Sequence, residues 1–477
     1  MNKLLNTFII GFSKECSFPE AIVKLENDNI IKICNWVTTK GYGNIDLMDF
    51  YHGRYFKNHE IKHQIPSELH NELLQYLFEF CYINSRTHLS HSYTEGVGSN
   101  IYHEVNEFHK FTQVIYDIFI ASKIDLVLFQ EIPHDGAEIV LYRLAKLMGI
   151  KTIILTNFTH FWGRSFAFYS LEDFGDFNEI PDLSDDANQI KIDYQDFKGK
   201  IFYMKNVSGY QSKLNFLNKK LRELRNKFLI KSFTKPFVSE VKFNRVLSRL
   251  VAAGLQYINI KNYKNNFESL LCADVDLKQK YIYFALHLDP EIPTVPPLAG
   301  IYHDQLLALE RLSKSVPSDV LIYVKENPKQ TDIVRSDSFF DRLKKLKNVR
   351  LVDRNTYELI DNSCFVATIA GTVGWEALTG GKNVLLFGKT WYQNFPGVFK
   401  FSENLDVEEI SNYKIDQNEF EQAVRKLINK STHGMTYFEF NNHNLTKITD
   451  IYPQYTRESN NEYLSSAIKK LIGYDSN

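Results

Sequence analysis

Apolar and polar positions alternate along this chain in a way that favours strands separated by helices. Residues 124–129 and 151–156 are short apolar runs, and residues 137–148 between them carry apolar side chains at helical spacing, ended by Gly149. This order predicts a strand–helix–strand unit of a parallel sheet. A further apolar run at 7–10 predicts the first strand of the chain.

The same alternation returns from residue 280 onward. The pattern predicts strands at 281–286, 320–324, 349–352, 364–367 and 384–387, and helices at 302–312, 337–346 and 356–361. We therefore expect an α/β protein with two Rossmann-like domains. In such sheets ligands bind at the polar loops that follow the carboxyl ends of the strands.

A segment of different character separates the two alternating regions. Residues 213–249 are rich in Lys and Arg, with Leu recurring at helical spacing. These basic helices present either a solvated face or a contact surface for an anionic membrane or an anionic glycan. We predict domains at 1–165 and 280–400, a linker or insertion at 166–279, and a helical tail at 401–477 that packs across the domains.

Composition narrows the class of protein. The chain has 477 residues, 44% of them hydrophobic, and a net charge of −1, so by charge it is not a nucleic-acid binder. Its five cysteines form no CxxC pair, which favours a reducing cytoplasm. The sequence shows neither a signal peptide nor a transmembrane segment, and we expect a cytoplasmic protein.

The glycine-rich segment TIAGTVGWEALTGG is the strongest candidate for a binding site. We expect Gly371 and Gly374 to let a ligand approach the backbone closely. Thr372 is expected to cap a helix whose first N–H groups, including that of Val373, face an anion. Glu376, expected in the first turn, adds a carboxylate for hydroxyl groups. The alternative is an ordinary connection between a helix and a strand.

Polar side chains also follow strands of the first domain. Glu131, His134 and Asp135 share one loop after the run at 124–129. A metal site is not expected there, because the spacing matches no ligand pattern. The string HEIKH at 59–63 fits the zinc motif H-E-x-x-H, but a proline follows closely, so we interpret it as a polar surface turn rather than a zinc-binding helix.

Two strings carry a resemblance to a known family. GTVGWEALTGGKNVLLFGKTWY at 371–392 and YVKENP at 323–328 resemble motifs of bacterial capsule polysaccharide biosynthesis proteins, which include the retaining Kdo transferases. The resemblance covers residues 280–400. Asn327 stands where the family has a histidine, and Asp304 in GIYHDQLLALERL matches a family aspartate.

The resemblance implies a GT-B architecture, in which two Rossmann-like domains face each other across a cleft. It further implies a glycosyltransferase that moves a nonulosonic acid of the Kdo, pseudaminic or sialic type from its CMP ester onto a capsular or surface glycan or glycolipid, with retention of configuration. No cofactor is expected besides the CMP-sugar donor. The alternatives are a UDP- or GDP-sugar donor, or a non-catalytic component of capsule assembly or export.

Roles for the candidate residues follow from this chemistry. The helix start at 372–374 and Lys325 would stabilise the phosphate leaving group, Asn327 would donate a hydrogen bond to it, and Glu376 would bind ribose hydroxyls. His287 would contact the donor carboxylate. For Lys325 and His287 the alternatives are a surface lysine and a structural hydrogen bonder.

Catalytic roles fall to three residues in this interpretation. Asp304 would face the anomeric carbon as nucleophile or ion-pair stabiliser, or else serve only as a charge at a helix start. Glu131 or His134 would accept the proton of the acceptor hydroxyl, or else cap their loop. We expect the protein in the cytoplasm, with the basic helices placing it at the inner face of the membrane.

Overall fold

The computed structural model describes most of the chain, in two compact units. Unit 1 comprises Met1–Asn84, Asn100–Ile192 and Phe420–Asn477, and unit 2 comprises Ser85–Ser99 and Asp193–Glu419. The described residues are 3–12, 19–39, 42–51, 53–91, 101–158, 160–161, 163–185, 187, 213–233, 240–289, 291–330, 332, 335–434, 436 and 457–474.

Unit 1 is built on a seven-stranded sheet with the order β13-β6-β5-β4-β1-β2-β3. Its strands are β1 (Leu5–Ile10), β2 (Ile31–Thr38), β3 (Ile45–Asp46), β4 (Leu126–Phe129), β5 (Lys151–Thr156), β6 (Arg164–Phe168) and β13 (Ser431–His433). The five strands from β5 to β3 pair in parallel, whereas β6 and β13 are antiparallel additions at one edge. The parallel strands β1, β4 and β5 are almost wholly buried, as continuous apolar runs require.

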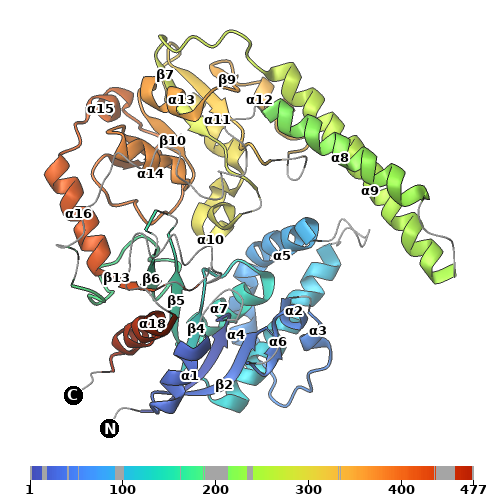
Figure 1. Ribbon diagram of the computed structural model, residues 1–477, viewed down its shortest axis with the longest axis vertical. Coiled ribbons are helices and arrows are strands. Elements are labelled where there is room, and N and C mark those ends of the chain that lie inside the picture. Colours follow the sequence, from blue (N-terminus) through green and yellow to red (C-terminus); the bar gives the residue numbers. More distant parts are fainter. Residues whose placement is uncertain are drawn as a thin grey trace. The chain divides into compact units, whose positions relative to one another are not determined.

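Helices connect and cover these strands. They are α1 (Pro19–Asn27), α2 (Leu47–Tyr51), α3 (Arg54–Lys57), α4 (Ser67–Leu73), the 3₁₀ turn η1 (Leu74–Tyr76), α5 (Leu77–His91), α6 (Ile101–Ser122), α7 (Gly136–Leu147), α16 (Gln417–Asn429) and α18 (Arg457–Ile472). Helix α18 contacts both α1 and β13, so the last described helix packs against the first (Figure 1).

Unit 2 is built on a six-stranded sheet with the order β12-β11-β10-β7-β8-β9, in which every pair of neighbours is parallel. Its strands are β7 (Tyr281–Ala285), β8 (Leu321–Lys325), β9 (Val349–Leu351), β10 (Val366–Thr368), β11 (Val384–Leu386) and β12 (Val398–Lys400). Its helices are α8 (Lys213–Phe233), α9 (Glu240–Leu270), η5 (Ile292–Thr294), α10 (Pro296–Ala299), η6 (Gly300–His303), α11 (Gln305–Ser315), α12 (Asp337–Lys344), α13 (Thr356–Asn362), α14 (Thr372–Thr379) and α15 (Val407–Asn412).

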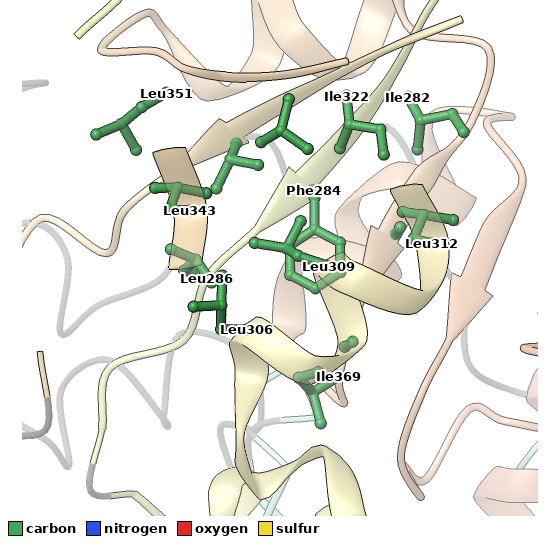
Figure 2. Close-up of a cluster of buried hydrophobic side chains, with 14 of the residues drawn as sticks. Ile282, Phe284, Leu286, Leu306, Leu309, Leu312, Ile322, Leu343, Leu351 and Ile369 are labelled. Atoms are coloured by element: carbon green, nitrogen blue, oxygen red, sulfur yellow. The ribbon is translucent and has the colours of Figure 1, made fainter. Parts of the chain in front are cut away.

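Both faces of the unit 2 sheet are covered. Ile282 and Phe284 of β7 point into a core that includes Leu309 of α11 and Leu343 of α12 (Figure 2). The alternate residue Tyr281 is also buried, and its hydroxyl donates to the carbonyl of Leu359 in α13. Two covered faces explain why the strands of this unit read as continuous apolar runs.

Helices α8 and α9 pack along each other as an antiparallel pair (Figure 1). Leu217 of α8 and Ile260, Tyr263 and Phe267 of α9 are buried in the unit 2 core. Helices α8 and α9 therefore belong to unit 2 and bury apolar side chains in its core. Lys and Arg side chains of α8 such as Lys219 are exposed to solvent.

The predicted fold class is confirmed: two α/β units with mainly parallel sheets, and a largely helical C-terminal segment. The facing of the two domains across a cleft stays a prediction. The compact units differ from the predicted segments, since 193–279 belongs with the second unit and 420–477 with the first. The physical reason is that β13 completes the unit 1 sheet beside β6.

Candidate functional site

Three neighbouring strands of unit 2 end side by side. The central strand β7 pairs with β10 and β8, and the register places Ala285 opposite both Thr368 and Lys325. The loops after these strands consequently share one edge of the sheet, where ligands of parallel α/β sheets bind. They carry His287, Asn327 and the glycine-rich turn.

His287 lies against the glycine-rich turn and is almost fully buried. Its Nε2 atom is 2.9 Å from Thr368 Oγ1 and accepts from the N–H of Ala370 at 3.3 Å. Burial, together with nearby Arg335, lowers the pKa of His287 to about 4, so the imidazole is neutral at pH 7. A Cβ on Gly371 would come within 2.8 Å of His287 Cε1, so only glycine fits beside this ring.

The N-cap of the motif's helix lies one residue earlier than predicted, at Gly371 and not at Thr372. Gly371, in extended conformation, is the N-cap of α14, and it has no side chain to cap with. Thr372 is already the first helical residue, so its predicted capping role is wrong. Glu376 consequently lies in the second turn and not in the first. Thr372 and Val373 are partly exposed at the helix start, whose first N–H groups have no partner inside the helix.

Gly374 is explained by protein packing. A Cβ on Gly374 would lie 2.2 Å from the hydroxyl oxygen of Tyr392, which is fully buried and donates to the carbonyl of Gly371. The two glycines therefore make room for His287 and for Tyr392. The groups that approach the backbone closely at this turn are side chains of the chain itself, and the close approach of a ligand stays a prediction.

Lys325 and Glu376 are connected through the start of α13. Lys325 Nζ donates to Thr356 Oγ1 at 2.8 Å, and burial lowers the pKa of Lys325 to about 8, although Asp353 raises it. Tyr357, the next residue, forms a side-chain hydrogen bond with buried Glu376. Burial raises the pKa of Glu376 to about 7 despite this bond. Lys325 is thus a partly buried group of the sheet edge and not a free surface lysine.

The loop after β8 is held by a buried ion pair. Arg335 Nε lies 2.9 Å from Glu326 Oε2, and both side chains are almost fully buried. Arg335 also donates to the carbonyl of His287 at 3.3 Å, which ties this loop to the loop after β7. Asn327 in the same loop accepts through Oδ1 from the N–H of Lys329, so its amide shapes the turn.

Asp304 is the N-cap of helix α11 and Gln305 is its first residue, and the two side chains bind different partners. Gln305 is buried and accepts from the N–H of His287 at 2.8 Å. Asp304 caps the helix by accepting from the N–H groups of Leu306 and Leu307, and its second oxygen pairs with Arg342 at 2.7 Å. Both Asp304 oxygens are thus engaged, which favours the structural role over the catalytic one.

The predicted acceptor loop of unit 1 is also capped and hydrogen-bonded. Asp135 is the N-cap of α7 and forms a capping box with Glu138. Glu131 accepts from the hydroxyl of Thr156, so it joins the ends of β4 and β5. His134 is 46% exposed and its Nδ1 lies 2.8 Å from the carbonyl of Ile132. This histidine is the accessible member of the loop.

Acidic neighbours shift the pKa values of this loop. Burial and Glu138 raise the pKa of Asp135 to about 7, and burial also raises the pKa of Glu131. Burial would lower the pKa of His134, but the adjacent carboxylates, Glu138 foremost, raise it above its ordinary value. Asp135 is therefore the group of this loop whose pKa lies near neutral pH.

The H-E-x-x-H string lies between helices α3 and α4, outside any helix. His59 and His63 both contact Asp117 of α6, at 2.8 and 2.9 Å. Burial would raise the pKa of Asp117, but the hydrogen bonds from His59, His63 and Lys62 lower it to about 2. The expected surface turn is confirmed, and no set of three or more His, Cys, Asp or Glu in the described part of the chain is placed to hold a metal.

Sequence reasoning missed the residues that hold the loops. Arg335 follows β8, and Tyr392 follows β11 as the last residue of the string at 371–392, but only packing brings these side chains to the loops that they hold. Glu326 had a signal, because a carboxylate inside the string YVKENP directly after a buried strand calls for a cationic partner. No helix within the described ranges combines the length and apolar content that a membrane span needs.

Comparison with solved structures gives only remote likeness. KpsC of Thermosulfurimonas dismutans, a beta Kdo 2,7 transferase, is 12% identical over 71% of this chain and 89% of that chain, with a TM-score of 0.31. A beta Kdo 2,4 transferase form of KpsC from the same organism is 10% identical over 65% and 82%, with a TM-score of 0.28. The UDP-GlcNAc 2-epimerase of Methanocaldococcus jannaschii is 14% identical over 88% and 99%, with a TM-score of 0.23. At such scores we draw no argument from them.

Comparison at the level of sequence families is more specific. Curated protein sequences give no match. Residues 248–436 match the model of the family described as capsule polysaccharide biosynthesis protein. This range contains the strand-end loops of unit 2, with His287, Lys325 and the glycine-rich turn, and it extends beyond both ends of the range in which the motifs were recognised. The predicted resemblance to capsule polysaccharide biosynthesis proteins is thereby confirmed for this part of the chain.

Proposed function

We propose that this protein is a glycosyltransferase of capsule polysaccharide synthesis. In this proposal it transfers a nonulosonic acid of the Kdo, pseudaminic or sialic type from a CMP-sugar to a capsular or surface glycan or glycolipid. The observation that carries the proposal is the family match over 248–436, because that range holds the sheet edge where three strands of unit 2 end together.

The geometry of the sheet edge supports binding of an anionic nucleotide. Lys325 supplies a partly buried cation at the end of β8, and the first N–H groups of α14 at Thr372 and Val373 supply positive dipoles. Asn327 completes a turn beside them. A phosphate leaving group is stabilised by such dipoles and cations more than by acid catalysis.

Glu376 and His287 suit binding better than proton transfer. Glu376 sits behind the turn, hydrogen-bonded to Tyr357, where a carboxyl group can accept from ribose hydroxyls. His287 is neutral and already hydrogen-bonded to Thr368, so it fixes the shape of the turn. In unit 1, Glu131 and His134 are the proposed bases for the acceptor hydroxyl.

The proposal has two further parts, retention of configuration, which rests on the family resemblance, and contact with a membrane, which rests on the charge of α8. Retention of configuration follows from the likeness to retaining Kdo transferases, and NMR of the product's anomeric centre measures it directly. Contact with an anionic membrane follows from the exposed cations of α8, such as Lys219 and Arg222. Liposome flotation at low and high salt measures this contact, and failure to bind anionic vesicles at low salt contradicts it.

Thermal stabilisation by nucleotides tests the donor. CMP is expected to raise the melting temperature, because a ligand that binds only the folded state stabilises it. UDP and GDP are expected to have no effect. Lys325→Met should abolish the shift by CMP, and Lys314→Met, at the far end of α11, is the matched control that should retain it.

The alternatives give different outcomes in the same experiment. Stabilisation by UDP or GDP in place of CMP would indicate a different sugar nucleotide. Absence of stabilisation by any nucleotide would favour a non-catalytic component that binds polysaccharide. Incubation with CMP-Kdo, CMP-pseudaminic acid and CMP-sialic acid, followed by analysis of released CMP, then identifies the sugar.

A further inference from the structure

Lys213 is the first residue of α8, and it is 2% exposed, whereas Lys219, Lys220 and Arg222 of the same helix are exposed. Its Nζ atom lies 3.1 Å from the carbonyl oxygen of Asn327 and 3.3 Å from that of Pro328, and it also donates to the carbonyl of Gln330. A single ammonium group therefore donates hydrogen bonds to three backbone carbonyls of the loop that follows β8.

The surroundings of Lys213 are those of a bound cation and not of an ion pair. Its Nζ atom lies 5.1 Å from the ring centre of Phe216 and 5.5 Å from that of Tyr263. Among the residues that the structure describes, no carboxylate lies within ion-pair distance of Nζ. Asp353 instead accepts from the backbone N–H of Lys213 at 3.0 Å, which fixes the helix start beside the loop.

Burying an ammonium is costly, so its contacts must offset that cost. Burial lowers the pKa of Lys213 to about 7, while Glu326 raises it and Arg335 lowers it further. An apolar side chain of the same length would fill this space without the penalty. The lysine is thus explained by the three carbonyls that its ammonium contacts, of which that of Asn327 also accepts from the N–H of Gln330 at 3.1 Å.

The opposite side of the loop is held independently. The side chain of Gln330 accepts from the N–H of Asp289 at 2.8 Å and donates to its carbonyl at 3.1 Å. Arg335 pairs with Glu326 at the start of the loop. Removing the Lys213 ammonium should therefore loosen the carbonyl side of the loop without releasing the whole of it.

We propose that Lys213 is a positioning residue of the donor site, which holds the loop 326–330 in the shape that receives the phosphate of a nucleotide sugar. Asn327, which replaces the histidine of the related motif, carries no charge of its own, and the Lys213 ammonium, when protonated, places a positive charge 3.1 Å from its carbonyl oxygen. The donor-binding part of this inference rests on the proposed function.

The experiment compares Lys213→Met with Lys219→Met, which removes an exposed lysine from the same helix. Hydrogen exchange of the peptide covering 326–330, without ligand, is expected to be about tenfold faster in Lys213→Met and unchanged in Lys219→Met. The dissociation constant for CMP is expected to rise about tenfold in Lys213→Met only, with the KM for donor following it and kcat changing less.

The outcomes separate the two proposals. Unchanged exchange in Lys213→Met would overturn the inference. Faster exchange with unchanged CMP affinity would overturn the role in donor binding. If the unsubstituted protein does not bind CMP, the proposed function fails and the donor-binding role fails with it, and exchange alone decides whether Lys213 orders the loop. If Lys213→Met does not fold, Lys213→Gln, which keeps a donor but no charge, takes its place, with a smaller rise in exchange expected.

Discussion

The strand-end loops of the two units manage buried charge in opposite ways. In unit 2, Arg335 lies between Glu326 at 2.9 Å and Asp289 at 3.8 Å, so a cation balances the carboxylates. In unit 1, Asp135 and Glu138 crowd one loop, and no Lys or Arg among the described residues pairs with either of them. The pKa of Asp135 is raised to about 7 as a result of burial and of Glu138.

Under the proposed function, this difference assigns binding to the unit 2 loops and proton transfer to the unit 1 loop. Paired ions fix the geometry of the unit 2 loops, which is what recognition of a charged ligand requires. A carboxyl group whose pKa is raised to about 7, as that of Asp135 is, can give and accept protons near pH 7. We therefore expect substitutions in unit 2 to change loop order and affinity, and substitutions in unit 1 to change the response to pH.

The largest expected effect is that of Arg335→Met. It leaves Glu326 and Asp289 buried without their cation, and the free energy of unfolding is expected to fall by about 3–5 kcal/mol. Urea denaturation followed by circular dichroism measures the loss. Arg342→Met, which breaks partly exposed pairs with Glu310 and Asp304, is the control, with a loss below about 1 kcal/mol. Equal losses in both variants would contradict the burial of the unit 2 pair.

A smaller effect is expected from Gly374→Ala, which tests how tightly the unit 2 turn is packed. The new methyl group would meet the Tyr392 hydroxyl, and about 1–3 kcal/mol of stability should be lost. Gly254→Ala in α9, where nothing lies within 4 Å, should instead gain about 0.5–1 kcal/mol. Adding Tyr392→Phe to Gly374→Ala should restore part of the loss, and the comparison fails if it restores none.

The unit 1 loop is tested through pH. The folded state raises the pKa of Asp135 from 3.8 to about 7, so between these pH values the folded state holds a proton that the unfolded state has released. The contribution of Asp135 to the free energy of unfolding is therefore present at low pH. It is lost as the pH rises, by up to about 1.4 kcal/mol per pH unit. Asp135→Asn keeps the cap and should flatten this decline.

Urea midpoints at pH 5, 6 and 7 measure the slope. Other buried carboxyl groups with raised pKa values, such as Glu376, leave part of the decline in the variant. Asp406→Asn, at the exposed N-cap of α15, is the control and should keep the slope of the unsubstituted protein. An unchanged slope in Asp135→Asn would show that this loop is not the acidic site we describe.

The smallest effect is expected from Asp304→Asn. Asparagine retains the helix cap and loses only a surface pair with Arg342, so stability should change by less than about 1 kcal/mol. Transfer of the sugar should stay within a few-fold of the unsubstituted rate. A loss of about a thousandfold or more, with stability retained, would restore the nucleophile role suggested by the sequence.

Sequence patterns predicted the parts of the fold that depend on local burial. The strands β4, β5, β7 and β8 were recognisable because both faces of a parallel strand are buried, which leaves a continuous apolar run. The edge strand β13 was not, because its three residues pair with β6 more than 250 positions away. Its short sequence, STH, carries no strand signal of its own.

In the candidate site too, residues marked by a local sequence pattern were predicted and residues placed by long-range packing were not. His287 and Lys325 were found because polar residues after buried strands meet at one sheet edge. Lys213 was hidden among the many lysines of 213–249, since composition does not tell a buried cation from exposed ones. The partner of each loop is fixed by tertiary packing, so the sequence predicted neither Arg335 nor the contact that Tyr392, a residue of the string at 371–392, makes with Gly371.

The return of β13 to the unit 1 sheet has a consequence for synthesis on the ribosome. Unit 2 is nearly continuous in sequence, whereas unit 1 needs residues 431–433 to cover β6. During translation unit 2 can therefore mature while unit 1 still presents an unpaired strand edge, and such edges recruit other chains. A chain interrupted before residue 431 is expected to aggregate through β6, which makes the nascent protein dependent on chaperones until residues 431–433 emerge.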